Sequence, residues 1–277
     1  MKLAQVSRYF DRTLVTDPVT GGFLFKAQFS NYDDSKRDAF TAYRRIMSLS
    51  PEITIPPTRV VSALGETWII GDGHPDGWAE LHRRKFVTHK AAGPALIWPL
   101  ADFMADRVPR ETFGDLQWAV DRAEEEVSSL TPQMFVAILP DTAEAPPHSV
   151  IQIGSDTMFV QSSAHHASGF LEARGYLQSG SAARTVDLVK RVFNPATGGY
   201  TNQTTATVRA LKVRWQELYE YANQLDERFQ EGDATFVVPP GTAVDTSTSL
   251  VHEGRKYTVL AVKPLVGGLA VHSRPAT

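Results

Sequence analysis

Two adjacent histidines, His165 and His166, closely follow a pair of serines, Ser162 and Ser163. Histidine is the commonest general base in enzymes and activates serine nucleophiles. One hypothesis is therefore a hydrolase in which either histidine serves as the base and either serine as the nucleophile. Nothing in the sequence fixes the geometry of these groups. Adjacent residues on a strand also point to opposite faces, so one zinc ion would not easily reach both rings. We expect the histidines to lie in a surface loop.

A second candidate is the glycine-rich segment 71–77, which reads Gly-Asp-Gly-His-Pro-Asp-Gly. A calcium loop of the EF-hand type needs a glutamate at its twelfth position. Counted from Asp72, the twelfth residue is Arg83, which has the wrong charge. No strand–loop–helix context surrounds the glycines, so a phosphate-binding loop is also unsupported. The composition predicts an ordinary turn.

No motif of a known catalytic class is present. The chain has no G-x-S-x-G, H-E-x-x-H or G-x-x-x-x-G-K-[ST] segment. It has no cysteine, which excludes disulfides, thiolate zinc sites and a cysteine nucleophile. None of its 31 acidic residues forms an isolated pair on an apolar strand, as a glycosidase would prefer. The basic cluster Arg83-Arg84-Lys85 is typical of a solvated strand end or a subunit contact. The sequence predicts no catalytic residue, no metal ion, no cofactor and no enzymatic activity.

The composition is that of an ordinary globular protein of 277 residues, with 42% hydrophobic and 21% charged residues. No run approaches 18 apolar residues, and the first eight residues contain no apolar signal region, so we expect neither a membrane span nor secretion. A net charge of −3 argues against a general nucleic-acid binder with a basic surface. The lack of cysteine suits synthesis in a cytoplasm.

The two ends of the chain resemble each other. Residues 17–23 reappear as 194–200, with the shared pattern Pro-x-Thr-Gly-Gly-aromatic. Three further landmarks follow in the same order: Lys26–Phe29 with Lys212–Trp215, Pro56-Pro57 with Pro239-Pro240, and Gly65–Ile70 with Gly254–Val259. Such order indicates an internal repeat, which determines the fold assignment. Superposition of the two ends should place Gly65 on Gly254 and Trp68 on Tyr257.

The middle of the chain repeats this plan more weakly. Pro146-Pro147 precedes Val150-Ile151, Gly154 and Met158–Val160, in the order seen from Pro56 to Ile70. A proline pair, an apolar strand, a turn glycine and a second apolar strand make a hairpin with a stiff lead-in. Chance would explain this third copy about as well as a true repeat would.

The predicted fold is mainly β, and α+β overall. Two similar small β-barrel-like modules, at residues 1–90 and 185–277, flank an α+β middle segment at 91–184. Short strands with glycine and proline turns are typical of small barrels and sandwiches. In the middle segment, apolar residues recur three and four apart, which predicts an amphipathic helix. Its apolar positions are Leu116, Ala119, Val120, Ala123, Val127 and Leu130.

Two segments near the C-terminus, Gly232–Val238 and Val251–Val259, resemble the head-closure proteins of tailed bacteriophages, which join head to tail as stoppers or adaptors. Val60–Asp72 is similar to the same element: a strand, a glycine, two polar residues, an aromatic residue and a second strand. The resemblance covers roughly residues 8–90 and 188–277. It departs from the family in size, because such proteins usually contain one barrel.

The resemblance implies a structural protein of the virion, made in the host cytoplasm. It would form a homo-oligomeric ring beneath the portal, between a portal or adaptor protein and a tail protein, and the genome would pass through without sequence-specific binding. Other structural roles in the virion that fit the resemblance are those of a tail terminator, a collar protein or another tail structural protein. A carbohydrate-binding tail-tip module is a further alternative, and would present exposed aromatics such as Trp78 or Trp98. The polar stretch Tyr200–Thr207 predicts an extended arm that adds to a neighbour's sheet, and the isolated chain is expected to be monomeric or weakly associated.

Overall fold

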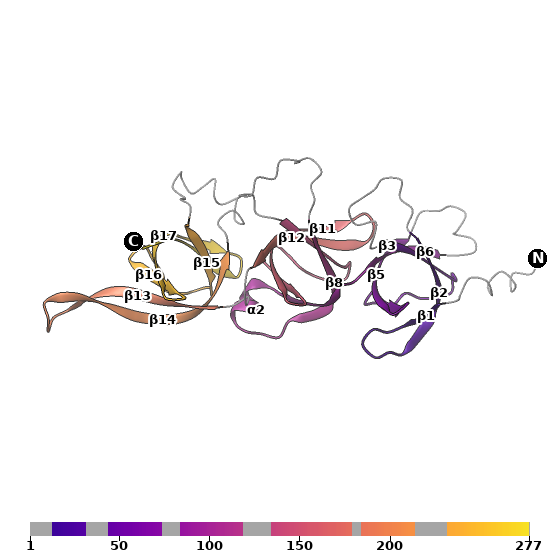
Figure 1. The fold of residues 1–277 in the computed structure, drawn as a ribbon, viewed down its shortest axis with the longest axis horizontal. Coiled ribbons are helices and arrows are strands. Elements are labelled where there is room, and N and C mark those ends of the chain that lie inside the picture. The colour runs from indigo at the N-terminus through magenta and orange to yellow at the C-terminus, as the bar shows by residue number, and fades with distance from the viewer. Residues whose placement is uncertain are drawn as a thin grey trace, which may run out of the picture.

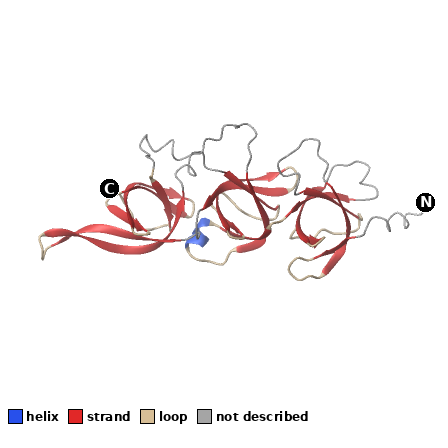
Figure 2. Cartoon of the chain, in the orientation of Figure 1, coloured by secondary structure: helices blue, strands red, loops and turns tan. Residues whose placement is uncertain are grey.

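The computed structural model describes residues 13–31, 44–73, 84–118, 134–178, 184–213 and 232–276. They form three closed barrels, each of six antiparallel strands, arranged in a row (Figure 1). These described residues form one short α-helix, α2 (Leu100–Met104), and their other regular elements are β-strands (Figure 2). The expectation of an α+β middle segment is therefore wrong, because residues 93–178 form a β-barrel of their own, the second of the three in chain order.

The first barrel consists of β1 (Thr13–Thr16), β2 (Phe23–Asn31), β3 (Arg44–Leu49), β4 (Val60–Ala63), β5 (Glu66–Gly73) and β6 (Arg84–Lys90). The second consists of β7 (Gly93–Trp98), β8 (Arg110–Trp118), β9 (Met134–Pro140), β10 (Val150–Ile153), β11 (Asp156–His166) and β12 (Phe170–Gln178). The third consists of β13 (Arg184–Asn194), β14 (Gly199–Val213), β15 (Ala234–Val238), β16 (Thr248–His252), β17 (Arg255–Leu265) and β18 (Gly268–Pro275).

All three barrels have the same topology. Numbered within each barrel from first to sixth, the strands follow one another around the ring as first, second, third, sixth, fifth, fourth. The ring closes where the first strand pairs with the fourth, at β1–β4, β7–β10 and β13–β16. Since one connectivity occurs three times in succession, the weak middle echo in the sequence reflects a true structural repeat.

The hairpin between the fourth and fifth strands confirms the predicted superposition of the two ends. Ala63 pairs with Glu66 and His252 with Arg255, so each loop has two residues. In both loops the central residues have positive φ, and Gly65 and Gly254 take the second position with φ of 76°. This is the pattern of a type I′ turn, whose twist matches that of the strands. Three positions later, the buried side chains of Trp68 and Tyr257 enter the cores of their barrels.

The middle barrel has the same hairpin with a different turn. Ile153 pairs with Asp156, and Gly154 takes the first turn position with a φ of 61°. Gly154 therefore corresponds to Leu64 rather than to Gly65. Met158 occupies the position of Trp68 and is fully buried. The turn at Gly154 has the pattern of a type II′ turn, which needs positive φ at its first central residue, whereas a type I′ turn needs it at both. The glycine therefore occupies a different turn position in the middle barrel.

Two of the sequence landmarks were aligned wrongly. Pro239 accepts a hydrogen bond from Thr242 at the beginning of the connection to the fourth strand, as Ser50 accepts one from Ile53. The pair Pro56-Pro57 instead lies at the end of the corresponding connection, where Pro56 accepts from Arg59. The proline pairs therefore lie at opposite ends of equivalent connections, and they do not give the correct alignment of the two barrels.

The second misaligned landmark is Lys26 with Lys212. Gln28 pairs with Ser48 in the first barrel, and Leu211 pairs with Val237 in the third. Ser48 and Val237 are each one residue from the end of their strands, so Gln28 corresponds to Leu211. Lys26 is therefore equivalent to Arg209, three residues away from the alignment that the sequence pattern suggested.

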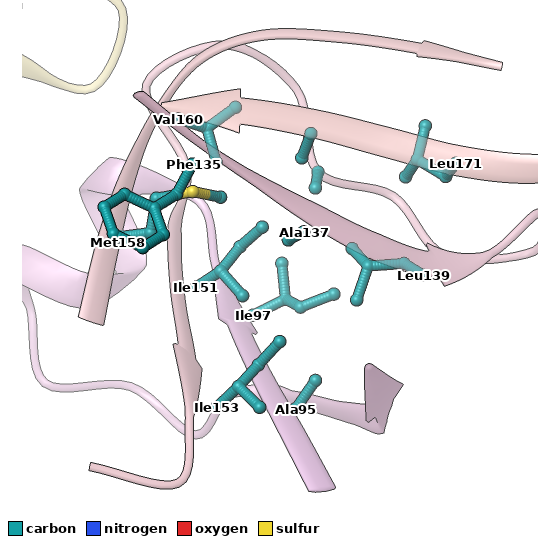
Figure 3. Close-up of a cluster of buried hydrophobic side chains, with 12 residues drawn as sticks. Ala95, Ile97, Phe135, Ala137, Leu139, Ile151, Ile153, Met158, Val160 and Leu171 are labelled. Carbon is teal, nitrogen blue, oxygen red and sulfur yellow. The ribbon is translucent and has the colours of Figure 1, made fainter. Parts of the chain in front are cut away.

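Each barrel has its own apolar core of inward-facing side chains (Figure 3 shows the second). In the second barrel, Ala95, Ala137 and Ala173 face larger residues such as Leu139 and Met158. Alternation of small and large side chains fills a narrow barrel without a channel. The barrels are therefore solid, and any function must lie on their surfaces or connections.

Two apolar junctions join the barrels in the row. At the first, Ile69 and Val87 of the first barrel pack against Ile138 and Phe170 of the second. At the second, α2 and Phe159 pack against the third barrel around Val237. Helix α2 lies in the connection between β7 and β8, so this connection of the middle barrel reaches onto its neighbour (Figure 1).

The junctions use equivalent positions, and these positions become polar at the two ends of the row. Ile69 and Phe159 occupy the same place in successive barrels, and the corresponding residue of the third barrel is the exposed Thr258. The position of Ile138 and Val237 is taken in the first barrel by Ser48. Repeat proteins end their stacks with such polar caps. These faces therefore do not favour continuation of the row from one chain to the next.

Candidate functional site

The histidine and serine pairs all lie on one strand, β11, and not in a loop as expected. Two of the side chains, those of Ser163 and His165, point to one face of the strand. His165 Nδ1 lies 2.5 Å from Asp141 Oδ1, and His166 Nδ1 accepts a hydrogen bond of 3.1 Å from the backbone N–H of Ser168. Among the described residues, no hydrogen bond links either serine to either histidine. The arrangement lacks the nucleophile–base contact of a hydrolase.

No group of three or more histidine, aspartate or glutamate side chains that could hold a metal ion occurs within the described ranges. The two histidines are held separately, since His166 Nε2 faces Glu172 at 4.0 Å while His165 faces Asp141. Both rings are exposed at the surface of the barrel.

The glycine-rich segment has a packing role where it is described. Its first three residues end β5, and Asp72 donates its backbone N–H to the carbonyl of Ser168 in the second barrel at 2.7 Å. A Cβ atom on Gly71 would lie 2.1 Å from that carbonyl oxygen. Glycine is needed because two backbones approach closely. Residues 74–77 lie outside the described residues.

The described members of the basic cluster and of the tryptophan pair include Arg84 and Trp98, and both of these have packing roles. Arg84 stacks over Phe86 with its guanidinium carbon 5.0 Å from the ring centre. Trp98 is only partly exposed, donates from Nε1 to the carbonyl of Arg107 at 2.9 Å and packs against Phe103 of α2. It stabilises the second junction, and is not free to stack on a sugar. Arg83 and Trp78 lie outside the described residues.

A buried polar contact lies between the first and second barrels. His89 of β6 is fully buried, and its Nε2 lies 2.8 Å from Oδ2 of Asp115 in β8. Gln117 also donates to that carboxylate. Buried polar groups must be matched to partners, so this contact fixes the relative rotation of two barrels that otherwise meet through non-directional apolar packing.

The most prominent surface feature is a long hairpin of β13 and β14, which extends past the third barrel at the end of the row (Figure 1). We call residues 191–203 the arm. Along β13, pairing to β16 ends at Lys190, and beyond it β13 pairs only with β14 in the part of the chain that the structure describes. Most of β14 from Tyr200 to Thr207 is exposed, which confirms the predicted extended arm and shows it to be two-stranded.

The arm is an insertion relative to the first barrel. Thr16 and Asp187 are equivalent, because each pairs with the last residue but one of the fourth strand. From that position to the turn is one residue in the first barrel (16 to 17) and seven in the third (187 to 194). Six residues were therefore added to this strand. The return strand is longer by the same number, since Gly22 to Gln28 spans six residues and Gly199 to Leu211 spans twelve.

The tip of the arm has exposed apolar side chains. Phe193 and Tyr200 pair across the strands, are 52% and 61% exposed, and pack edge to face with ring centres 5.4 Å apart. The guanidinium of Arg191 lies over the Tyr200 ring at 5.0 Å. The neighbouring Val192 is 40% exposed. Exposed aromatics that are already ordered lose little entropy on binding, which is typical of contact surfaces.

The turn at the tip is held by its own side chain. Asn194 Oδ1 accepts the backbone N–H of Ala196 at 3.0 Å, as Asp17 Oδ1 accepts those of Val19 and Thr20 in the first barrel. In Asp17 the bond from the Thr20 backbone, followed by that from Val19, lowers the pKa of the carboxyl group. The Asx turn explains the repeated motif without any catalytic role.

At the root of the arm is an open pocket of about 300 Å³. Its walls include the apolar side chains of Leu188, Ala206, Val208 and Ala243. A bulge shapes it: the register shifts between Leu188 and Val189, and the extra residue, Thr205, donates its hydroxyl to the carbonyl of Leu188 at 3.1 Å. Bulges re-aim strands at barrel rims.

Lys190, which lines this pocket, is paired with an ionised carboxylate beside it. Lys190 Nζ lies 3.0 Å from Asp245 Oδ2, and the Asp245 side chain is 56% exposed. Hydrogen bonds from the Ser247 side chain first, and then from Lys190 and Thr248, hold the pKa of Asp245 well below its usual range. The pocket therefore combines apolar walls with a lining lysine that is held in an ion pair with the ionised carboxylate of Asp245.

The sequence indicated the arm but not the pocket. Polar residues from Tyr200 to Thr207 suggested an extended segment, and a longer gap between the repeat landmarks could have shown its length. The pocket depends on a bulge and on a distant loop at Thr242 and Ala243, and no local pattern predicts that meeting.

Comparison of the chain with models of protein families, with curated proteins and with solved structures finds no match. No helix among the described residues is long and apolar enough to cross a membrane.

Proposed function

We propose that this chain is a structural protein of a tailed-bacteriophage virion that forms a homo-oligomeric ring at the head–tail interface below the portal. The observation that carries the proposal is the pairing of three solid barrels, whose described residues offer no catalytic constellation, with one arm whose aromatic tip is exposed. Such a molecule is built to contact other proteins. The bacteriophage assignment itself rests on the sequence resemblance to head-closure proteins.

The geometry is consistent with repeated contacts. A ring needs a heterologous interface, in which two different surfaces of one chain meet. The arm and the side of the barrel row are such different surfaces. The outer edge of β14 pairs with β15 at 211–213 only, so far as the chain is described, which leaves the backbone of the arm available to a neighbouring sheet.

The partners proposed are the portal or an adaptor above the ring and a tail protein below it, with the genome passing through without sequence-specific binding. A net charge of −3 suits such a channel, because strong phosphate contacts would hold the DNA back. A tail terminator or collar protein would use the same features, and the position of the ring in a particle distinguishes these stations. The virion is the corresponding location, after synthesis in the host cytoplasm.

A hydrolase is the competing class, and its best residues are His165 or His166 with Ser162 or Ser163. The side chain of His165 has the aspartate partner that a catalytic histidine would need, at 2.5 Å. Loss of any hydrolytic activity in His165→Ala and Ser163→Ala variants, against a panel of ester and peptide substrates, would support this class. No activity in the wild type is the result that we expect.

The test of the main proposal is the composition of a particle. The genes beside the one for this chain should encode a portal protein and a major capsid protein. Electron microscopy of the corresponding virions should show a ring of this chain between head and tail, whereas light scattering of the purified chain should show a monomer or weak association. A stable closed dimer in solution, with no trace of the chain in any particle, would refute the proposal.

A further inference from the structure

We infer that the aromatic tip of the arm from one chain occupies the pocket at the arm root of the next chain, so that the copies associate tip to root. This inference rests on the ring assembly proposed above and identifies its contact. The tip offers Phe193, Tyr200 and Arg191. The root offers the pocket around Leu188 and Ala243.

The first argument is a match in size and polarity. The pocket holds about 300 Å³, and a cavity of about 150 Å³ is enough for a benzene ring. Its apolar walls suit an aromatic side chain, and burying an exposed aromatic ring is among the most favourable single contacts at protein interfaces.

The second argument is charge. Arg191 lies against Tyr200 at the tip and brings a cation with the ring. Asp245 lies beside the pocket, where its carboxylate is 56% exposed and is paired with Lys190, a residue of the pocket lining. A tip that enters the pocket brings Arg191 to this ion pair, where the guanidinium and Lys190 share the carboxylate and so help to fix the orientation of the ring.

The third argument comes from the same connection in the middle barrel. There the segment between the first and second strands contains α2, and its Leu100 and Phe103 are buried against the next barrel in the row. The corresponding segment of the third barrel is the arm, which extends away from the three described barrels (Figure 1). None of these barrels covers its apolar residues, and the surface that we infer to cover them is that of another copy.

The tip cannot enter the pocket of its own chain. Tyr200 and Ala206 are six residues apart on one extended strand, which separates them by about 20 Å. The contact therefore joins two chains. Because it uses two different surfaces, a joined pair still has one free tip and one free root, and further copies add until the assembly closes into a ring, provided that the rotation between copies closes.

Disulfide trapping tests this contact cleanly, because the chain has no native cysteine. One preparation carries Tyr200→Cys and the other carries Ala243→Cys, and the two are mixed at high concentration under mild oxidation. We expect a crosslinked dimer that contains one chain of each kind. A double variant with both cysteines should give a ladder of multimers, because the tip is about 20 Å along the strand from Ala206 in the pocket wall, too far for a disulfide into the pocket of the same chain.

The matched control uses Phe23, which occupies the place of Tyr200 in the equivalent motif of the first barrel and is 62% exposed. A Phe23→Cys chain mixed with the Ala243→Cys chain should crosslink at least tenfold more slowly than the Tyr200→Cys mixture. Ala206→Trp in the Ala243→Cys chain, which fills the pocket from an exposed position, should abolish its crosslink with the Tyr200→Cys chain. Equal rates for the Tyr200 and Phe23 mixtures would overturn the inference.

The result separates this contact from the assembly itself. If the crosslink is no faster than the control while virions contain a ring of this chain, the tip-to-root contact is wrong and the proposed function stands. If the crosslink forms but no particle contains the chain, the contact stands and the bacteriophage assignment falls.

Discussion

The connection between the first and second strands is buried against a neighbouring barrel in the second barrel and is exposed in the third. In the second barrel it contains α2, whose Phe103 is 4% exposed against the neighbouring barrel. In the third it is the arm, whose Phe193 is 52% exposed. The barrels share one topology, so the difference lies in the length and apolar residues of one loop. The scaffold is constant, and this connection carries the contacts.

The two junctions differ in the same instructive way. Both junctions have an apolar centre, and they differ in their polar contacts. Between the second and third barrels the polar contacts include an ion pair at the surface, Arg209 with Asp106, whereas between the first and second barrels His89 and Asp115 form a buried contact and the backbones approach closely at Gly71. The junction of the second and third barrels therefore depends mainly on buried apolar area, and that of the first and second depends also on exact geometry. Substitutions at the junctions and at the arm should therefore affect stability very differently.

The largest loss is expected at the apolar junction. Phe103→Ala would remove an aromatic ring that packs against Trp98 and the third barrel, and should lower the free energy of unfolding by about 4 kcal/mol. Urea denaturation measures this change. Val108→Ala, in the same connection but 88% exposed, is the control and should change it by less than about 0.5 kcal/mol. Equal effects would mean that α2 does not hold the barrels together.

The next largest loss is expected at the backbone contact of the first junction. Gly71→Ala would place a methyl group 2.1 Å from the carbonyl oxygen of Ser168, and should cost about 3 kcal/mol because neither backbone can move freely. Gly73→Ala serves as the control, since a Cβ atom there would lie 3.6 Å from its nearest neighbour, the carbonyl oxygen of Lys85. Thermal unfolding of the two variants compares them. A stable Gly71→Ala protein would show that the first two barrels can separate without penalty.

The buried polar contact should come third. Asp115→Ala leaves His89 without its carboxylate partner in a fully buried position, and should cost about 2 kcal/mol. The comparison is Glu66→Ala, which breaks the pair with Lys90 at the surface, where such pairs contribute less than about 1 kcal/mol. Denaturant curves measured side by side decide the point, and a smaller loss for Asp115→Ala than for Glu66→Ala would contradict it.

These three effects also show what the sequence could and could not predict. Period-two alternation and the turn glycines identified the terminal barrels, because turn chemistry is local. The helix predicted from Leu116 to Leu130 cannot be compared beyond Trp118, since residues 119–133 lie outside the described ones, but Leu116 itself belongs to β8. The apolar spacing there fits a helix as well as a strand, and such short patterns do not discriminate between them.

The candidate site was less predictable than the fold. His165 and Ser163 drew attention because of their chemistry, yet the structure shows no bond between them. Gly71 was predicted to belong to an ordinary turn and His89 attracted no prediction, because the groups they pack against lie about 100 and 26 residues away in the sequence. Contacts between repeats depend on three-dimensional arrangement, and a single sequence gives little access to it.

A smaller effect concerns pH and is confined to the third barrel. Burial, and to a lesser extent the positive charge of Lys263, lowers the pKa of His272 from 6.5 to about 4. Between pH 6.5 and pH 4, His272 is protonated in the unfolded chain but neutral in the folded chain. The free energy of unfolding therefore falls as the pH decreases through this range. From pH 7 to pH 5 we expect a loss of about 1.5 kcal/mol from this group. Denaturation of His272→Gln at both pH values should show a correspondingly weaker pH dependence, and parallel curves for variant and wild type would disprove it.

The smallest effect on stability is expected where the effect on assembly is greatest. Deletion of Val192, Phe193, Tyr200 and Thr201 removes two adjacent cross-strand pairs from the arm and brings Arg191 and Asn202 next to the turn pair. An even number of pairs preserves the alternation of the hairpin, so the register of the barrel is unchanged. The deleted side chains contact no barrel core, and the free energy of unfolding should therefore change by less than about 0.5 kcal/mol. The shortened chain should nonetheless fail to enter particles when it replaces the full chain. If it assembles normally, the arm is dispensable, and the contrast between α2 and the arm has no functional meaning.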